Sequence, residues 1–234
     1  MIPLRDANPT RRTPVVTLSL ILLCFVAFGW ELVVLAQGGD QRLGDFVTIH
    51  GVVPADLTDS VRGGNWISLP VLGIVTSLFL HADWWHLLGN MLYLWIFGNN
   101  VEDWLGRPAF IAFYLVGGVA AVAGQVAVDP RSDGAMIGAS GAISAVLGAY
   151  LVLFPGARIQ SLVYLGLFYQ LIAVPAVLVL GFWFALNLLD AIGWIGAGGE
   201  TGVAFFAHVT GFIAGVLLAL PFRLKRQPMP ALAA

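Results

Sequence analysis

The sequence predicts an all-α polytopic membrane protein, a bundle of six transmembrane helices in one domain. Hydrophobic residues make up 59% of the 234 residues and charged residues only 10%, whereas a soluble domain carries about 25% charged residues. Several stretches reach the roughly 20 apolar residues that a helix needs to cross the hydrocarbon core. We therefore expect the lipid bilayer to surround the chain. The net charge of −2 does not indicate a nucleic-acid partner.

The predicted spans are the apolar stretches between charged, proline-rich or glycine-rich segments. They cover residues 15–37, 84–101, 108–128, 140–155, 171–194 and 201–222. An N-terminal segment, 1–14, precedes the first span, and a basic tail, 223–234, follows the last. We expect both of these end segments to be cytoplasmic.

The distribution of basic residues argues against a seventh span, although Gly63–Ala82 and Ile159–Gln170 are also apolar. With six spans both termini lie on one side, together with Arg5, Arg11, Arg12, Arg107, Arg158, Arg223, Lys225 and Arg226. The other side holds only Arg42, Arg62 and Arg131. Because cytoplasmic loops are enriched in Lys and Arg, we expect a multi-pass protein of the cell (inner) membrane with both termini cytoplasmic. Pro70 and Gly73 interrupt the first stretch, so residues 37–83 are predicted to be an outer loop partly immersed in the membrane.

The fourth span is shorter than the membrane is thick. Ser140–Phe154 would be about 22 Å long at 1.5 Å per residue, against a hydrocarbon core of roughly 30 Å. This helix must then begin below the outer surface, where irregular backbone is tolerated only inside protein or beside a water-filled cavity. We therefore expect Ser140 at a helix N-terminus within the membrane, facing a wet cavity.

Polar side chains inside spans are costly and are functional candidates by default. His86 and Asn90 are four residues apart, on one face of the second span, and His208 lies in the outer half of the sixth. The predicted topology puts all three at the depth of Ser140. A serine nucleophile needs a base within hydrogen-bond reach, and His208 is the best candidate. His86, Asn90 and the backbone N–H of Ser140 could stabilise an oxyanion.

Each of these residues also has a purely structural interpretation. An isolated membrane serine is more often a packing residue, and a lone histidine or asparagine can join helices by a hydrogen bond. His81 is five residues from His86 and falls on another face, so we expect it to pack rather than react. The sequence has no HExxH motif or other paired-ligand spacing, so neither a metal nor a cofactor is expected.

Small residues recur along one face of span four and one face of span six. They are Ser140, Ser144 and Gly148 on span four, and Gly211 and Gly215 beside His208 on span six. Small residues at this spacing let membrane helices approach closely. We expect the two faces to pack on each other and to hold imidazole and hydroxyl within about 3 Å. The alternative is that glycine is simply common in membrane helices.

Three segments together resemble the rhomboid family of intramembrane serine proteases, of bacterial type. They are FLHADWWHLLGNMLYLWIFGNNVEDWLG (Phe79–Gly106), GASGAISAVLGAY (Gly138–Tyr150) and AHVTGFIAG (Ala207–Gly215). Each motif is weak alone, but the ordered set is specific. Rhomboids are six-span proteases with a Ser–His dyad and no acidic third member.

The resemblance implies an intramembrane serine endopeptidase with Ser140 as nucleophile, His208 as base, and His86 and Asn90 as oxyanion donors. Its substrates would be single-span membrane proteins, cleaved near the outer membrane face without a cofactor. One alternative is a catalytically inactive relative that binds membrane helices. Another is a transporter or channel, but inverted repeats and paired broken helices, which would support it, are not evident.

Two positions depart from familiar rhomboids. Ser144 stands where certain members carry a tyrosine against the catalytic histidine, so His208 lacks that stacking partner. Asn187 ends the segment WFALN, where many bacterial relatives have glutamine. We expect these differences to affect rate and substrate choice more than the existence of the activity.

Overall fold

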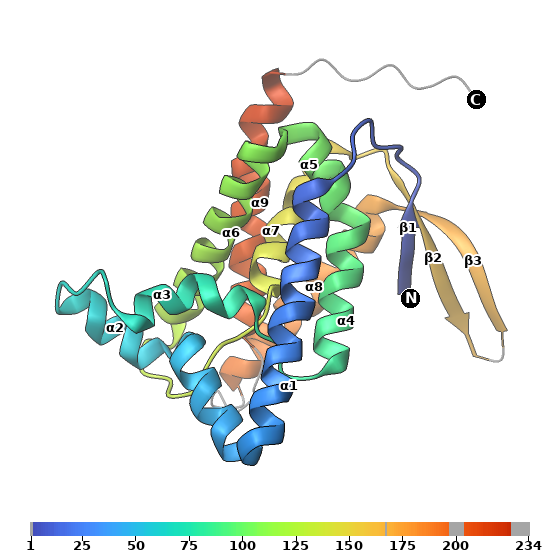
Figure 1. Ribbon diagram of the computed structural model, residues 1–234. Coiled ribbons are helices and arrows are strands. Elements are labelled where there is room, and N and C mark those ends of the chain that lie inside the picture. Colours follow the sequence, from blue (N-terminus) through green and yellow to red (C-terminus); the bar gives the residue numbers. More distant parts are fainter. Residues whose placement is uncertain (1, 167, 197–203, 226–234) are drawn as a thin grey trace.

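The computed structural model describes residues 2–166, 168–196 and 204–225 (Figure 1). The helical elements are α1 (Val15–His50), α2 (Pro54–Arg62), α3 (Leu69–Thr76), η1 (Ser77–Phe79), α4 (Trp84–Tyr93), η2 (Leu94–Gly98), α5 (Asn99–Leu105), α6 (Arg107–Val128), α7 (Ser140–Leu153), α8 (Ala176–Gly196) and α9 (Phe205–Lys225). The predicted helical, polytopic class is confirmed. Residues 201–203 of the predicted sixth span and most of the basic tail, from Arg226 on, lie outside the described residues.

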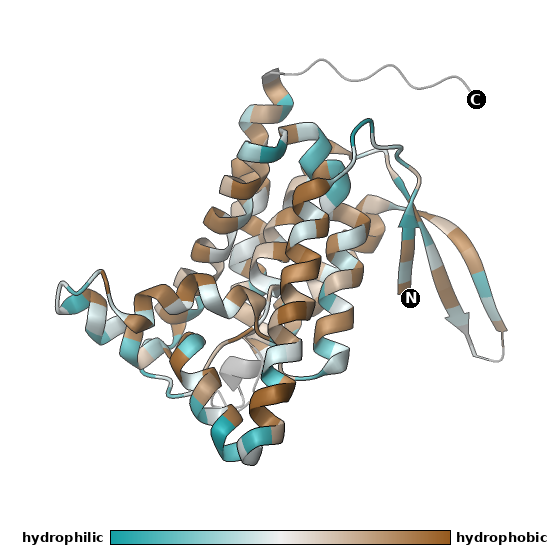
Figure 2. Cartoon of the chain, in the orientation of Figure 1, coloured by the Kyte–Doolittle hydropathy of each residue, from teal (hydrophilic) through white to brown (hydrophobic). Residues whose placement is uncertain are grey.

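Among the described residues, four helices are long and apolar enough to cross a membrane: α1, α6, α8 and α9. The segments Leu69–Phe79 and Trp84–Leu105 form a fifth, broken unit bent by 77°. Large apolar side chains such as Leu22, Val26 and Trp30 point outward from α1, and Figure 2 shows hydrophobic residues along the outer sides of the bundle. These features define a multi-pass membrane protein, whereas the count of six spans stays a prediction.

Helix α7 is the centre of the bundle, packed against α6, α8 and α9 (Figure 1). Every residue from Gly141 to Tyr150 is buried, which explains why this helix is apolar on all sides. Its 14 residues extend over about 21 Å. The helix that begins at Ser140 is therefore shorter than its neighbours.

The stretch that we expect to be an outer loop, 37–83, contains short helices. Gly39 breaks α1 with a φ of 66°, a left-handed conformation that favours glycine, just after the predicted end of span one. Pro70 interrupts nothing, because it lies in the first turn of α3, where its missing N–H leaves no hydrogen bond unmade. The immersion of this segment stays a prediction.

A three-stranded antiparallel sheet, which was not expected, lies beside the bundle (Figure 1). Its strands are β1 (Ile2–Asp6), β2 (Arg158–Leu165) and β3 (Phe168–Pro175), in the order β1-β2-β3. The prediction that span five starts at Leu171 is therefore wrong, since α8 begins only at Ala176. The hydrophobic pattern of a short apolar run, such as the one that forms β3, does not distinguish a strand from a buried helix.

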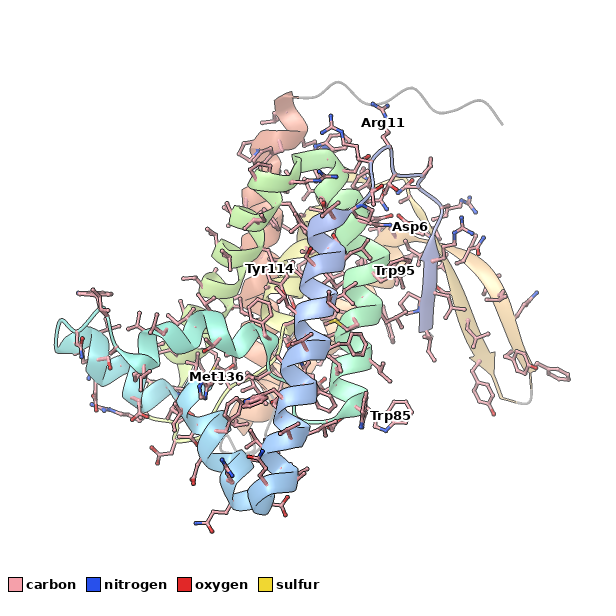
Figure 3. All side chains as sticks on the ribbon, viewed as in Figure 1. Asp6, Arg11, Trp85, Trp95, Tyr114 and Met136 are labelled. Atoms are coloured by element: carbon pink, nitrogen blue, oxygen red, sulfur yellow. The ribbon has the colours of Figure 1, made fainter. Side chains whose placement is uncertain are left out.

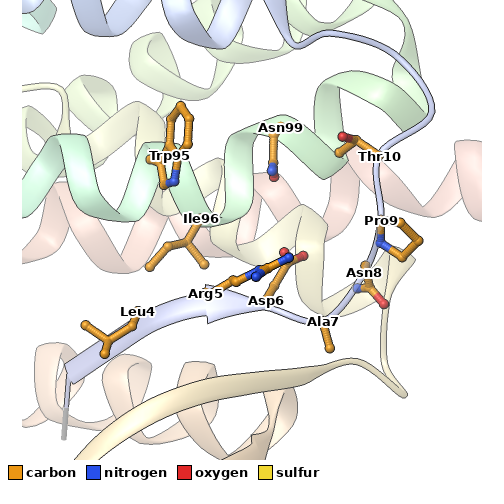
Figure 4. A pocket seen from close by; sticks show the side chains of 10 residues that line it. All are labelled: Leu4, Arg5, Asp6, Ala7, Asn8, Pro9, Thr10, Trp95, Ile96 and Asn99. Carbon is orange, nitrogen blue, oxygen red and sulfur yellow. The ribbon is translucent and has the colours of Figure 1, made fainter.

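A buried polar cluster attaches the N-terminal segment to the end of α7. The Asp6 carboxylate accepts hydrogen bonds from the Asn100 amide and from the Tyr150 hydroxyl, the latter at 2.9 Å. The Asn8 amide donates to the same hydroxyl at 2.8 Å. Figure 4 shows Asp6 and Asn8 beside a pocket of about 480 Å³, with Trp95 across from them. Burial raises the pKa of Asp6 to about 6, although the Tyr150 hydrogen bond lowers it.

This cluster predicts a pH-dependent stability. The pKa of Asp6 is higher in the folded than in the unfolded chain, so protonation of this carboxyl stabilises the fold. Its contribution to the free energy of unfolding is complete below about pH 4 and is lost as the pH rises through about 6. The melting temperature should fall by roughly 5–10 °C between pH 4 and pH 7, because a rise of about two pKa units corresponds to about 2–3 kcal/mol and each kcal/mol shifts the melting temperature of a chain of this size by roughly 2–4 °C. Scanning calorimetry of wild type and Asp6→Asn checks this.

Asp6→Asn mimics the protonated acid, so its melting temperature should change less over that pH range. Asp133→Asn, which removes an exposed carboxyl, should follow wild type. If the melting temperature of Asp6→Asn changes with pH as much as that of wild type, a group other than Asp6 causes the pH dependence of stability.

Candidate active site

Ser140 and His208 lie in contact although they are 68 residues apart. Ser140 is the first residue of α7, and His208 lies in the first turn of α9. The His208 Nε2 atom is 2.8 Å from the Ser140 Oγ. Figure 3 shows Asp6 and Arg11 at one end of the bundle and Met136, which precedes Ser140 in the chain, towards the other. Ser140 and His208 line one cavity together with Met136, so the pair lies towards that end of the bundle, opposite the start of α1.

The predicted small residues lie where α7 and α9 touch. A Cβ atom on Gly148, Gly211 or Gly215 would collide with the backbone of the facing helix. The obstructing carbonyl oxygens belong to Phe212, Gly141 and Ala145, respectively. The Ser144 Oγ donates to the Ser140 carbonyl oxygen at 2.6 Å, and the Ser144 Cβ would be 3.3 Å from a Cβ on Gly211. Backbone contact along these faces holds the two helices at short range.

His86 lies on the other side of Ser140, in the first turn of α4. The Asp83 carboxylate caps this helix by accepting from the His86 backbone N–H at 2.9 Å. The Ala82 N–H donates to His86 Nδ1 at 3.3 Å, so in the neutral ring Nε2 carries the proton. A Cβ on Gly138 would be 2.7 Å from that Nε2 and 3.6 Å from the Ser140 Oγ. The His86 Nε2–H and the Ser140 hydroxyl thus both lie next to the position that a Cβ on Gly138 would occupy.

Asn90 lies one turn further along α4 and is 7% exposed. Its Nδ2 donates to the His86 carbonyl oxygen at 2.9 Å, which leaves one amide hydrogen. His86, Asn90, Ser140 and His208 all line one cavity of about 820 Å³. The structure therefore brings every polar residue singled out in the spans to a single cavity.

Asn187 of α8 is a site residue whose contact the sequence did not predict. Its Oδ1 atom is 2.7 Å from His208 Nδ1. The sequence marks Asn187 only as a departure from the family pattern, although an amide inside an apolar span is a usable signal. Trp183 and Phe205 lie beside the imidazole, with ring centroids at 6.2 and 6.5 Å. These rings provide the aromatic contact that Ser144 cannot.

His81 does not reach Ser140. It is 2% exposed, its ring lies against that of His86 at 5.2 Å, and its backbone N–H donates to the Glu31 carboxylate at 3.2 Å. The chain that leads into α4 is thereby tied to α1, a role for Glu31 that was not expected.

Among the described residues, no group of His, Cys, Asp and Glu could hold a metal ion.

The chain is thus a helical multi-pass bundle in which a serine and a histidine are in contact at one cavity. The Rhomboid domain model matches residues 69–225, and this chain belongs to the rhomboid family, which includes intramembrane serine proteases. The predicted family is confirmed.

Similar proteins occur in bacteria and in mitochondria. Rhomboid protein 1, mitochondrial, of Saccharomyces cerevisiae is 33% identical over 153 residues, which are 62% of this chain and 40% of that protein. Rhomboid protease GluP of Bacillus subtilis is 34% identical over 161 residues, 69% of this chain and 28% of that protein. Presenilin-associated rhomboid-like protein, mitochondrial, of Homo sapiens is 34% identical over 99 residues, 41% of this chain and 25% of that protein. The matches thus span less than half the length of these relatives.

Proposed function

We propose that this protein is an intramembrane serine endopeptidase in which Ser140 is the nucleophile and His208 the general base. The observation that carries the proposal is the 2.8 Å contact between His208 Nε2 and Ser140 Oγ. Serine is a weak nucleophile until an adjacent base accepts its proton. The cavity beside the pair supplies space for the substrate backbone and for water.

The reaction needs only these two side chains and water. As the Ser140 Oγ attacks the peptide carbon, its proton moves to His208 Nε2 and the carbonyl oxygen becomes an oxyanion. The imidazolium then protonates the leaving nitrogen, the C–N bond breaks, and the acyl group stays on Ser140 as an ester. Water attacks this ester with His208 again as base, which releases the new carboxyl end and restores the serine hydroxyl.

Three hydrogen-bond donors belong to residues that line the cavity beside the Ser140 Oγ. The Ser140 backbone N–H lies in the first turn of α7, where amides have no intrahelical acceptor. The His86 Nε2–H borders Gly138, and Asn90 retains one amide hydrogen. Fixed donors of this kind stabilise the charge that develops in the transition state.

The substrates in this proposal are single-span membrane proteins. A substrate helix must unwind locally, because its own hydrogen bonds and side chains shield the peptide carbonyl. Cleavage falls near the outer face of a cell (inner) membrane, with both termini of the enzyme cytoplasmic. The short helix α7 and the basic residues near both chain ends support this orientation.

Purified protein in liposomes, mixed with a single-span substrate tagged at both ends, tests the function. We expect two fragments, with the new ends located by mass spectrometry within or beside the outer part of the span. Wild type that releases no more fragment than Ser140→Ala would contradict an endopeptidase and favour a helix-binding relative.

The oxyanion donors give a separate prediction. His86→Ala and Asn90→Ala should each lower kcat by about 10²–10³-fold, because losing one such donor costs about 2.7–4 kcal/mol in the transition state. Residual turnover should persist, since the Ser140 backbone N–H remains. Steady-state kinetics in liposomes measures this. His50→Ala, outside the cavity, should behave like wild type; unchanged turnover in both single variants would make His86 and Asn90 structural.

A further inference from the structure

We infer that Asn187 is a positioning residue for the reaction: it holds the His208 imidazole in the tautomer whose Nε2 lone pair faces Ser140. The inference rests on the proposed roles of Ser140 and His208, and it adds a third, neutral member to that pair.

Two hydrogen bonds fix the Asn187 amide. Its Nδ2 donates to the Trp183 carbonyl oxygen, one turn earlier on α8, at 2.9 Å. Its Oδ1 then faces His208 Nδ1 at 2.7 Å. Exchanging the oxygen and nitrogen would bring two oxygens together at Trp183, so the network selects this orientation.

The amide orientation determines which imidazole nitrogen carries the proton. A carboxamide oxygen can only accept, so His208 Nδ1 must donate. In the neutral ring, Nε2 is then left with a lone pair, 2.8 Å from the Ser140 Oγ. The opposite tautomer would point an N–H at the hydroxyl and could not accept its proton. Asn187 therefore selects the reactive form before substrate arrives.

The same bond persists through the reaction. When Nε2 gains the serine proton, the imidazolium still donates from Nδ1 to Asn187, so the ring cannot turn away from the substrate. An uncharged amide does this without placing a carboxylate inside the membrane, which would be costly. Because Trp183 both orients the amide and lies beside the imidazole ring, α8 supports the base from two directions.

The test compares Asn187→Leu, which keeps the side-chain size, with Asn187→Gln, which keeps the amide. Leu189→Ala, on the exposed side of α8, is the control. Asn187→Leu should lower kcat/KM by about fivefold, which corresponds to the roughly 1 kcal/mol that a neutral hydrogen bond contributes, and Asn187→Gln should recover most of the loss. Each variant is melted to verify folding.

¹⁵N NMR of histidine-labelled protein at neutral pH supplies the readout that a structural role would not move. His208, assigned by its absence in His208→Ala, should give the signature of a protonated Nδ1 in wild type and should lose it in Asn187→Leu. A protonated Nε2 in wild type, or an unchanged signature in Asn187→Leu, would overturn the inference. Since the spectrum needs no turnover, failure of the proposed protease function would appear separately, as absent cleavage by wild type.

Discussion

Ser140→Ala and His208→Ala should each reduce cleavage of a single-span substrate to background. The first variant removes the atom that forms the acyl bond, and the second removes the group that takes its proton. Losing either member of such a pair lowers turnover by about 10⁴-fold or more, which is over about 5 kcal/mol in the transition state. Fragment release from liposomes, followed over hours, measures the loss.

Ser144→Ala is the matched control, because it removes a neighbouring hydroxyl that, within the described part of the chain, bonds to the Ser140 carbonyl oxygen and not to His208. This variant should still cleave. Ser140→Ala should melt within a few degrees of wild type, since one neutral hydrogen bond contributes about 1 kcal/mol. Substantial cleavage by folded Ser140→Ala or His208→Ala would remove the basis of the mechanism.

Gly215→Val should lose activity and thermal stability together, although it deletes no reactive group. A side chain there would collide with the Ala145 backbone of α7, and backbone cannot move aside as a flexible side chain can. Overpacking a well-packed contact typically costs about 1–3 kcal/mol. A shift of about 1 Å between reacting groups can lower the rate by roughly 100-fold. Turnover and melting temperature, measured on the same sample, check both effects.

Gly29→Val on α1 is the control, because a Cβ there meets nothing within 4 Å. It should melt and cleave like wild type. If Gly215→Val also behaves like wild type, close packing of α7 on α9 does not hold the reactive pair in place.

The polar members of the site could be predicted because a membrane span makes them conspicuous. His86, Asn90, Ser140 and His208 interrupt segments that are otherwise apolar, and their depth follows from the topology. The spacing of Gly211 and Gly215 likewise indicated a contact face. The family resemblance then gave each residue an expected role.

The remaining features depend on rotation and pairing that a linear pattern does not encode. Asn187 and His208 come together only when α8 and α9 adopt particular rotations about their axes. The sheet needs Ile2–Asp6 to pair with Arg158–Leu165, a partner that no local periodicity indicates. In a membrane protein, an apolar run such as Ile159–Gln170 is ambiguous between helix and strand.

The most direct test of the central claim is covalent labelling of the intact protein in liposomes with a fluorophosphonate, which reacts with activated serine hydroxyls. Mass spectrometry of the digested product locates the adduct. The account predicts one adduct, on Ser140, in wild type and none in His208→Ala. An adduct on another serine, no adduct in wild type, or undiminished labelling of Ser140 in His208→Ala would contradict the claim that His208 activates Ser140.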